Sequence, residues 1–323
     1  MGNTGKIIAV CISEKKGVQK KEVPSGVLVP DWGIEGDAHA GKWHRQVSLL
    51  SYDKVNRFRE SEKMKTEGTG GSADVSLIRN GAFGENLLVE GIDLSSLPVG
   101  TGLQIGECFL VVSQIGKACH SHCEIYKKMG DCIMPREGIF AEVIKGGTVR
   151  PGDEVKCIPQ DKDSPFTAAV ITLSDRAFEG SYEDRSGPVI ESMLTEAGYV
   201  VKEKLLLPDG KEKLAAELRR LSDQRQINVI FTTGGTGFSE RDLTPEATKE
   251  VCDREVPGIG EALRAYSLTI TKNAILSRQT AGIRKRSLII NLPGSPKAVR
   301  EDLEYLLPAL GHGLGILRGT EGD

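Results

Sequence analysis

Two aspartates and three glycines in the second half of the chain are the residues best suited to carry out chemistry. Asp209 and Asp242 each follow a different run of β-strand type. Three glycines precede the second aspartate: Gly234, Gly235 and Gly237. Glycines let the backbone approach an anion closely and direct several N–H groups at it, and Mg²⁺ prefers carboxylate oxygens as ligands. These residue types therefore indicate a site for a phosphate compound and a magnesium ion.

The same residues also have a purely structural interpretation. Many glycine-rich turns between a strand and a helix bind nothing; in that case Asp209 is a turn residue, and Asp242 caps the approach to a helix. The glycine segment is not a P-loop, because Gly-Lys-Ser/Thr does not follow it, and it is not the Gly-x-Gly-x-x-Gly of dinucleotide-binding folds. Residue types alone leave both interpretations open.

Alternating strand and helix patterns fill the second half of the chain. Apolar or alternating runs predict strands at residues 168–173, 200–207, 227–232 and 287–292. Leucines at helical spacing predict a helix over residues 211–222. Three hydroxyl residues shortly before prolines, Ser186, Thr244 and Ser295, are expected to cap further helices. This order predicts an α/β domain with a doubly wound parallel sheet between helices, an αβα arrangement.

The candidate residues fall where such a sheet binds ligands. Four segments leave the carboxyl ends of the predicted strands: residues 172–176, 207–210, 232–245 and 291–296. Ligands of doubly wound sheets bind at these ends. The helix expected after Thr244 would also turn the positive end of its dipole toward a phosphate. The pattern therefore places both aspartates and the glycines on one edge of the sheet.

Residues 166–318 carry motifs that resemble the molybdopterin adenylyltransferase family, which includes the gephyrin G domain and its plant counterpart. The motifs are TLSDRAFEGSYEDRSGP, LLPDG, TTGGTGFSERDLTPEAT, REVPGIGEALR and AILSRQTAGIRKRSLIINLPGSPKA, in this order. The resemblance implies an αβα fold and an assembly that is often trimeric. It also implies an enzyme in which the molybdopterin phosphate attacks the α-phosphorus of Mg-ATP, with adenylylated molybdopterin and pyrophosphate as products.

This resemblance assigns roles to individual positions. Asp209 and Asp242 match the family's essential acidic pair, so they are the expected catalytic residues and the expected Mg²⁺ ligands. Positions that match its phosphate loop and other pocket motifs, and are expected to bind nucleotide or cofactor, are Ser174, Asp175, Gly234, Gly235, Thr236, Gly237, Glu261, Pro293, Gly294 and Ser295. Residues 277–279 and 284–285 also match, and they either contact an anion or are solvated charges.

The first half of the chain has a different composition and pattern. It holds six of the seven cysteines and both tryptophans. Short β-type runs separated by glycine turns predict strands at residues 7–11, 47–50, 103–105, 109–112 and 154–158. One helix is expected over residues 52–64. We therefore expect a mostly β, barrel-like domain.

Three segments of this half, residues 33–49, 81–87 and 114–123, resemble the MOSC domain, which is named after the C-terminal part of molybdenum-cofactor sulfurase. Members of that family handle molybdenum cofactor or transfer sulfur through one key cysteine. This cysteine corresponds to Cys119, which the resemblance makes a ligand of the molybdenum or tungsten of a bound cofactor, or the carrier of persulfide sulfur. The sequence departs from the family's Pro-Cys pattern, because Ala118 precedes the cysteine.

The cysteines around Cys119 leave other interpretations open. Together with Cys123, Cys132 and the intervening histidines, it suits a structural zinc or an iron–sulfur cluster, although Cys-x3-Cys-x8-Cys is not a standard zinc spacing. Buried, inert thiols are a further alternative. Side chains expected to line the same pocket are Asp37, His39 and His44, the last of which has the alternative of a core histidine.

Boundaries and composition set the remaining expectations. The polar residues 159–165, which contain two prolines, separate an expected MOSC-like domain at 1–158 from an expected adenylyltransferase-like domain at 166–323. The net charge of −3 lacks the basic excess of nucleic-acid binders, and no apolar run reaches the length of a membrane span or of a signal-peptide core. We therefore expect a cytoplasmic protein that binds neither nucleic acid nor membrane.

The two resemblances together predict a bifunctional, homotrimeric enzyme of molybdenum-cofactor synthesis. One half would adenylylate molybdopterin with Mg-ATP, and the MOSC half would bind molybdenum or tungsten cofactor or handle sulfur. The expected partners are a molybdenum insertase and molybdenum or tungsten enzymes. One alternative is a non-catalytic cofactor carrier, against which the presence of Asp209 and Asp242 argues. The other is the insertase itself, whose family has additional domains.

Overall fold

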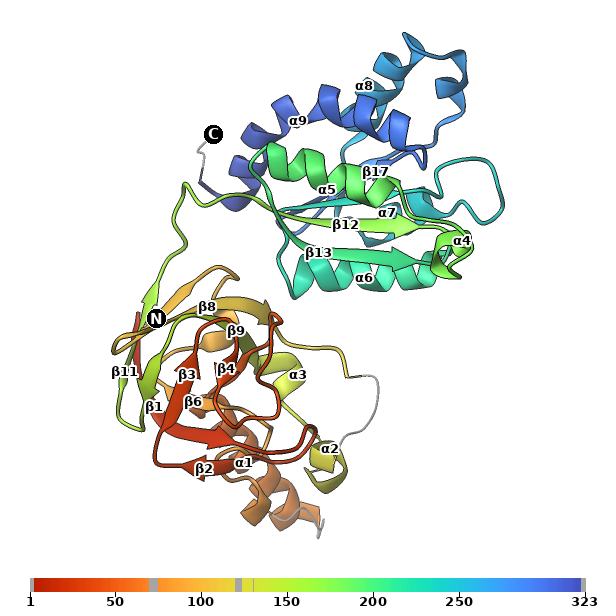
Figure 1. Ribbon diagram of the computed structural model, residues 1–323. Coiled ribbons are helices and arrows are strands. Elements are labelled where there is room, and N and C mark those ends of the chain that lie inside the picture. The colour runs from red at the N-terminus through yellow and green to blue at the C-terminus, as the bar shows by residue number, and fades with distance from the viewer. Residues whose placement is uncertain (1–2, 70–74, 120–123, 130, 321–323) are drawn as a thin grey trace. The chain divides into compact units, whose positions relative to one another are not determined.

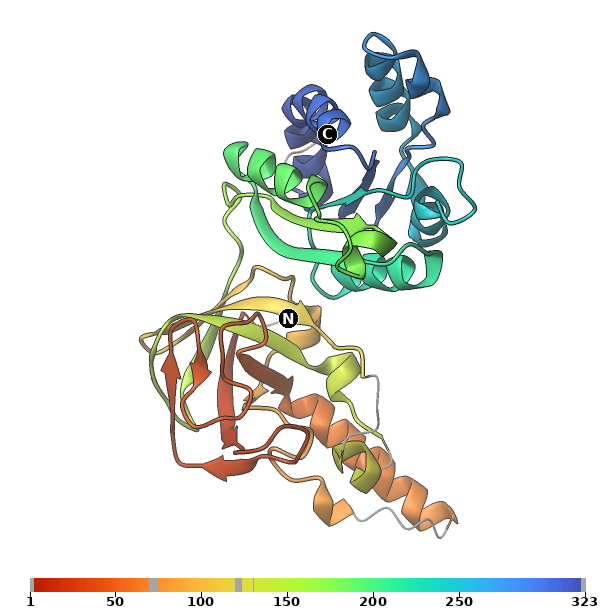
Figure 2. The same ribbon diagram turned by 45° about the vertical axis from the view of Figure 1, so that its right-hand side comes forward.

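The computed structural model describes residues 3–69, 75–119, 124–129 and 131–320 (Figures 1 and 2). The chain divides into two compact units, Met1–Asp161 and Lys162–Asp323. The division falls inside the segment 159–165 that the sequence marks as a linker. Each unit has its own hydrophobic core, as a domain does.

The N-terminal unit consists mainly of strands joined by short loops. Its strands are β1 (Thr4–Ile12), β2 (Lys21–Val23), β3 (Gly26–Val29), β4 (Gly33–Ile34), β5 (Val47–Ser51), β6 (Leu87–Glu90), β7 (Gly102–Ile105), β8 (Cys108–Ile115), β9 (Ile139–Lys145), β10 (Gly147–Val149) and β11 (Glu154–Ile158). Its described helices are α1 (Tyr52–Thr69), α2 (Glu124–Met129) and α3 (Met134–Glu137), with 3₁₀ turns η1 (Val75–Leu77) and η2 (Leu94–Ser96).

One large sheet closes on itself in this unit. Its strands follow the order β11-β7-β8-β9-β5-β6-β1-β2, and β11 also pairs with β1. That last pairing brings Thr4 opposite Lys156. Side chains alternate between the inside and the outside of the barrel along each strand. Apolar side chains that point inward, among them Leu49, Leu103 and Leu110, are fully buried. The expectation of a mostly β, barrel-like fold is confirmed.

The C-terminal unit alternates strands and helices. Its strands are β12 (Thr167–Leu173), β13 (Val200–Leu207), β14 (Val229–Thr233), β15 (Arg254–Glu255), β16 (Ala281–Arg284) and β17 (Ser287–Leu292). Its helices are α4 (Asp175–Phe178), α5 (Ser186–Glu196), α6 (Lys211–Asp223), α7 (Thr244–Val251), α8 (Pro257–Leu268) and α9 (Pro296–Arg318), with the 3₁₀ helix η3 (Lys272–Leu276). Across the described residues of both units, the helices fall short of the length and apolar character that crossing a membrane requires.

The C-terminal sheet has the order β13-β12-β14-β17-β16-β15. The first four strands are parallel, whereas β16 and β15 are antiparallel additions. Helices α5, α8 and α9 cover one face, and α6 and α7 cover the other (Figures 1 and 2). This confirms the expected αβα fold. The antiparallel edge departs from an all-parallel sheet because β16 reaches β17 through a two-residue turn, in which Lys285 has φ +51°.

Two helices start differently from the sequence expectation. Ser186 is the first residue of α5 rather than its cap, and the carboxylate of Asp184 accepts its N–H at 3.1 Å instead. Thr244 is likewise the first residue of α7, and its hydroxyl donates to the carbonyl of Gly234 at 2.9 Å. Ser295 does precede α9, but its side chain makes no cap bond. The Ser186 and Thr244 hydroxyls are therefore available to tie loops together.

The segment before β12 is fastened to the C-terminal unit. Arg318, at the end of α9, donates to the carbonyls of Ser164 at 2.5 Å and Pro165 at 3.0 Å. Its guanidinium also lies 4.0 Å from the centroid of the Phe166 ring. Residues 164–165 are therefore held on this unit.

Candidate functional site

Four loops leave the same edge of the C-terminal sheet. β12, β13, β14 and β17 are parallel, so their carboxyl ends lie together. Each strand is followed by one of the loops that carry the expected site residues. The loops begin at Ser174, Pro208, Gly234 and Pro293. Contacts between the loops decide which site residues the fold brings together.

Reciprocal hydrogen bonds between two aspartates join the first two loops. The backbone N–H of Asp209 donates to Oδ1 of Asp175 at 2.9 Å, and the N–H of Asp175 donates to the Asp209 carboxylate at 3.2 Å. Arg241, in the third loop, donates to Oδ2 of Asp175 at 2.5 Å. Asp175 therefore connects the loop of Asp209 with the loop of Asp242.

The Asp242 carboxylate turns back into its own loop. Its Oδ2 accepts the N–H of Ser239 at 2.8 Å and lies 2.9 Å from the position that a Cβ would take on Gly237. Within the described residues, neither Asp209 nor Asp242 forms an ion pair, so only N–H groups offset their charge. Half-buried carboxylates with no cationic partner fit Mg²⁺, which usually combines one or two carboxylates with substrate phosphate oxygens and water.

The glycine loop combines structural glycines with free donors. Gly234 and Gly235 have φ values of +96° and +64°. A Cβ on Gly234 would clash with the Leu173 carbonyl of β12, and a Cβ on Gly235 would clash with the Thr244 hydroxyl of α7. The N–H groups of Gly235, Thr236 and Gly237 donate to no acceptor in the part of the chain that is described. Three successive unpaired donors on one loop form the kind of concavity that binds anions.

The fourth loop packs directly on the glycine loop. The hydroxyl of Thr233 donates to the carbonyl of Pro293 at 2.6 Å, and the hydroxyl of Ser186 donates to that of Gly294 at 2.8 Å. A Cβ on Gly294 would lie 3.5 Å from the Cα of Gly234. The loops that follow β14 and β17 are thus held together at the sheet edge.

The remaining expected site residues differ in their surroundings. Ser174 caps α4 by accepting the N–H of Ala177 at 3.2 Å, and Thr236 is buried. Ser295 is exposed at the start of α9. Glu261 is exposed on α8, and within the described residues no hydrogen bond or ion pair joins it to the other expected site residues. Its role at the site stays a prediction.

Two charged residues at this edge were not singled out from the sequence. Arg241 bridges to Asp175, as above, and Asp184 accepts the hydroxyl of Thr172 at 2.8 Å. A signal existed for each: Arg241 stands directly before Asp242, and Asp184 lies two residues before the start of α5. Acidic residues are common just before a helix.

The arginines of the motifs at 277–279 and 284–285 bond acceptors within the protein, which neither interpretation from the sequence included. Arg284 donates twice to the carboxylate of Asp223, at 2.9 and 2.5 Å, and once to the carbonyl of Val251 at 2.8 Å. Arg278 donates to three acceptors around the glycine loop. The side chains of Arg284 and Arg278 are 19% and 34% exposed, respectively.

In the N-terminal unit, Asp37, one of the residues expected to line the cofactor pocket, forms a buried ion pair with Lys20. The ammonium nitrogen of Lys20 lies 2.5 Å from a carboxylate oxygen of Asp37, and both side chains are fully buried. The Asp37 carboxylate also accepts the N–H groups of Ser13 and His39, each at 3.0 Å. Burial alone would raise the pKa of Asp37, but the bonds from His39 and Lys20 outweigh it and hold that pKa below its usual range.

Cys119 lies exposed beyond the end of β8. The ring nitrogen Nε2 of His44 lies 2.8 Å from Oε1 of Gln114, so the histidine segment contacts the strand that leads to the cysteine. Cys132 is buried, while Cys123 falls outside the described residues. Among the residues that are described, no three metal-ligating side chains gather in one place.

Glu85 is a second fully buried acid of this unit, and the charge of Lys20 acts on it. Its carboxylate accepts the N–H groups of Gly81 at 2.7 Å and Phe83 at 3.0 Å, but burial dominates and raises its pKa from 4.5 to about 7. Well below pH 4.5 the acid is neutral in both the folded and the unfolded state. Between pH 4.5 and 7 only the unfolded state releases the proton, so stability falls as the pH rises.

We expect Glu85→Gln to flatten this part of the stability profile. The wild-type unit should lose on the order of 3 kcal/mol of unfolding free energy between about pH 4.5 and 7.5 from this group, and the neutral variant should lose none of it. Urea unfolding followed by tryptophan fluorescence measures this unit alone, because both Trp32 and Trp43 belong to it. Parallel pH profiles for the two proteins would contradict the expectation.

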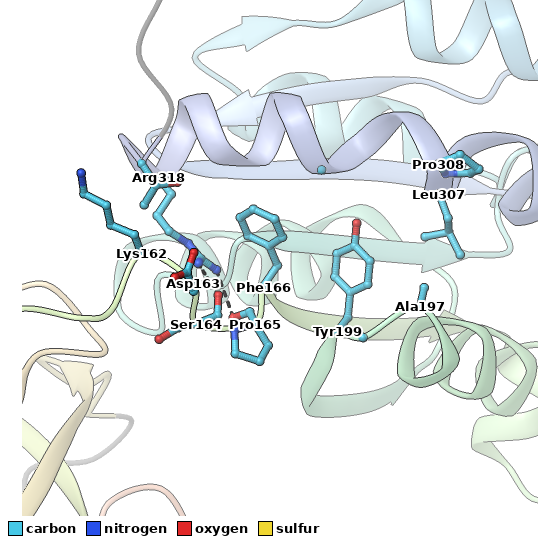
Figure 3. Close-up of a pocket in the computed structure, with 13 residues that line it drawn as sticks. Lys162, Asp163, Ser164, Pro165, Phe166, Ala197, Tyr199, Leu307, Pro308 and Arg318 are labelled. Atoms are coloured by element: carbon cyan, nitrogen blue, oxygen red, sulfur yellow. Dashed lines mark hydrogen bonds between the residues drawn. The ribbon is translucent and has the colours of Figure 1, made fainter.

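A pocket of about 610 Å³ lies at the other end of the C-terminal sheet. Phe166 and Tyr199, which directly precede β12 and β13, line it together with Leu307, Pro308 and Arg318 (Figure 3). These are the amino ends of the strands whose carboxyl ends carry the candidate site. The pocket is therefore separate from that site.

Two protein families match the chain, one in each unit. Residues 36–156 match the MOSC domain family. Residues 169–312 match the family described as probable molybdopterin binding domain.

Known relatives match the C-terminal unit. The molybdopterin adenylyltransferase of Helicobacter pylori strain J99 is 45% identical over 155 residues, which are 47% of this chain and 87% of that protein. The molybdopterin adenylyltransferase of Escherichia coli K12 is 44% identical over 145 residues, 44% of this chain and 74% of that protein. Among solved structures, the molybdopterin biosynthesis enzyme MoaB of Thermus thermophilus is 44% identical with a TM-score of 0.46; the match covers 48% of this chain and 97% of that one.

Proposed function

Because the chain belongs to the molybdopterin adenylyltransferase family through its C-terminal unit and has a MOSC domain in its N-terminal unit, we propose that it is a two-part enzyme of molybdenum- or tungsten-cofactor synthesis. The C-terminal unit adenylylates molybdopterin with Mg-ATP. The strongest support is the sheet edge where Asp175 and Arg241 link the loops of Asp209 and Asp242, beside a loop with three free N–H groups.

In the proposed reaction, an oxygen of the molybdopterin phosphate attacks the α-phosphorus of ATP. A new P–O bond forms there, the bond from the α-phosphorus to the α,β-bridging oxygen breaks, and pyrophosphate leaves with that oxygen. Both reactants are polyanions, so the protein must mainly position them and offset their charge. The free N–H groups of Gly235, Thr236 and Gly237 suit one of these phosphates, because they are hydrogen-bond donors that no protein acceptor occupies within the described residues.

The two aspartates would hold Mg²⁺ together with phosphate oxygens and water. When bound, that ion offsets the negative charge of the phosphates and of the departing pyrophosphate. Asp209 is kept in place by its reciprocal bonds with Asp175, and Asp242 by the N–H of Ser239. Asp175 also holds Arg241, so a cation stands beside the acidic edge where the anions would enter.

For the N-terminal unit we propose binding of the metal-containing cofactor or handling of its sulfur, with Cys119 as the reacting or ligating thiol. Molybdenum and tungsten favour soft ligands, and a thiolate is the softest ligand that a protein side chain offers. Cys119 is exposed, so a cofactor can reach it. The MOSC match over residues 36–156 includes this position.

We further propose that the protein is a homotrimer in the cytoplasm. It would pass its product to a molybdenum insertase, which supplies molybdenum or tungsten enzymes. Apolar side chains left exposed on α8, η3 and the residues between them support an interface between copies of this unit. These are Leu268, Ile270, Ile275 and Leu276, which are 46%, 43%, 71% and 50% exposed.

The full chain and a fragment of Lys162–Asp323 test this proposal together. We expect both to release pyrophosphate from molybdopterin and Mg-ATP, to lose that activity when Mg²⁺ is removed, and to sediment as trimers. The fragment keeps the whole αβα sheet and the Arg318 bonds to Ser164 and Pro165. An active full chain with an inactive fragment would disprove the independence of the units. If the full chain binds both substrates without pyrophosphate release, that result would favour the carrier alternative.

A further inference from the structure

The loop that carries Asp242 has little packing of its own. Phe238, which directly follows the last free N–H of the glycine loop at Gly237, is 72% exposed, and residues 239–241 are also exposed. Inside the loop, Asp242 and Ser239 exchange two hydrogen bonds: Ser239 N–H to the carboxylate at 2.8 Å, and Asp242 N–H to the Ser239 carbonyl at 2.9 Å. These bonds shape the loop but do not attach it to the rest of the unit.

Arg241 joins the loop to the loop of Asp209 through its bond to Asp175, and Arg278 provides a further attachment at the ends of the loop. Its Nε donates to the carbonyl of Gly237 at 2.7 Å, one Nη donates to the carbonyl of Asp242, and the other donates to the carboxylate of Glu246 in α7. Its backbone N–H donates to the carbonyl of Thr236 at 3.1 Å. Arg278, which lies 36 positions along the chain from Asp242, therefore bonds both ends of the loop 237–242.

The segment of Arg278 is itself anchored in the interior. The side-chain amide of Gln279 donates to the carboxylate of Asp302 at 2.6 Å, and Asp302 is fully buried in α9. The hydroxyl of Ser267 in α8 donates to the same carboxylate at 3.1 Å. Arg264 donates to the carbonyl of Gln279 at 2.6 Å. Hydrogen bonds to α8 and α9 thus hold the segment of Arg278, the residue that bonds the exposed loop.

We infer that Arg278 is a positioning residue for Asp242, which it holds in the orientation that binds Mg²⁺ in the adenylylation proposed above. This inference rests on that proposed function. Each of the three guanidinium nitrogens already donates to an acceptor of the loop or of α7, and Glu246 offsets the positive charge. These bonds direct the guanidinium at the loop, so we assign Arg278 to holding the aspartate. Its two remaining N–H groups make direct contact to a substrate phosphate the competing outcome of the test.

The test compares Arg278→Lys with a matched control in the full chain. Lysine keeps the charge but has no planar fork, so it cannot hold two carbonyls and a carboxylate at once. Arg284→Lys is the control, because Arg284 also bonds one carboxylate and one carbonyl but lies around Asp223, away from the loop. Circular dichroism and thermal unfolding monitor the fold of both variants.

For Arg278→Lys we expect kcat to fall on the order of 10²-fold, with little change in KM for ATP, and the Mg²⁺ concentration for half-maximal rate to rise. Added Mg²⁺ should restore part of the rate. Arg284→Lys should keep the wild-type Mg²⁺ requirement. A higher KM for either substrate at unchanged kcat would instead make Arg278 an anion contact and overturn the inference, as would a slower variant with an unchanged Mg²⁺ requirement.

Binding of Mn²⁺, followed by electron paramagnetic resonance in the presence of ATP, separates this inference from the proposed function. We expect wild type to bind Mn²⁺ more tightly than Arg278→Lys, and Asp242→Asn to bind it most weakly. If wild type shows no binding that depends on Asp242, the proposed function fails and the inference fails with it. If binding depends on Asp242 but is the same in Arg278→Lys, only the inference fails.

Discussion

Asp242→Asn is expected to lower the rate of pyrophosphate release from molybdopterin and Mg-ATP by roughly 10² to 10⁴, while the protein stays folded. Asparagine has nearly the same shape, and its carbonyl can still accept the N–H of Ser239, so the loop keeps its internal bond. What it loses is the charge that would hold Mg²⁺ at the sheet edge. Steady-state kinetics at saturating substrates, with a coupled pyrophosphate assay, give the ratio.

Glu240→Gln is the matched control for that experiment. Glu240 is an exposed acid two residues earlier in the same loop, and removal of its charge should leave turnover close to wild type. If both variants slow the reaction equally, the loop's overall charge and not the position of Asp242 sets the rate. Nearly wild-type turnover in Asp242→Asn would remove this residue from the mechanism.

The second large effect is expected at the exposed thiol of the N-terminal unit. Cys119→Ser should lose the molybdenum or tungsten cofactor, or the persulfide, that the wild-type protein retains on purification, and should still adenylylate at the normal rate. Serine keeps the size and polarity of the side chain but lacks the soft sulfur. Metal analysis and mass spectrometry of the purified proteins measure the retained cofactor, and pyrophosphate release measures the other unit.

Cys123→Ser and Cys132→Ser are the controls for Cys119→Ser. Cys132 is buried, so its replacement acts mainly on packing and should have a smaller effect on retained cofactor. If all three variants instead release stoichiometric zinc and destabilise the unit equally, the three thiols form a structural metal site. Cys119 would then have no special role.

Local sequence pattern determined most of the secondary structure near the candidate site. The apolar run at 168–173 is β12, the alternating run at 200–207 is β13, and the leucines at 211–222 lie in α6. Strand and helix periodicities depend on neighbouring residues only, so one sequence contains them. The same patterns implied the doubly wound sheet, and with it the edge to which Asp209 and Asp242 belong.

Partners of the polar side chains in the loops were harder to predict. Ser186 and Thr244 were expected to cap helices, but their hydroxyls bond the carbonyls of Gly294 and Gly234. A hydroxyl before a helix has several acceptors within reach, and the choice depends on which loop the fold brings beside it. The carboxylate of Asp184 accepts the N–H groups of Ser186 and Gly187 at the start of α5, at 3.1 and 3.0 Å.

The sequence by itself determined the two fold classes and the residues that gather at the carboxyl edge of the second sheet. Only the tertiary structure decided how those residues are held. Asp175 bonds Asp209 across 34 positions of the chain, and Arg278 reaches Asp242 across 36. Such bonds depend on the order of strands in the sheet and on the packing of α8 and α9, which no local pattern contains. The closure of the first sheet, where Thr4 meets Lys156, has the same physical reason: pairing between distant strands is set by the whole core and not by either strand alone.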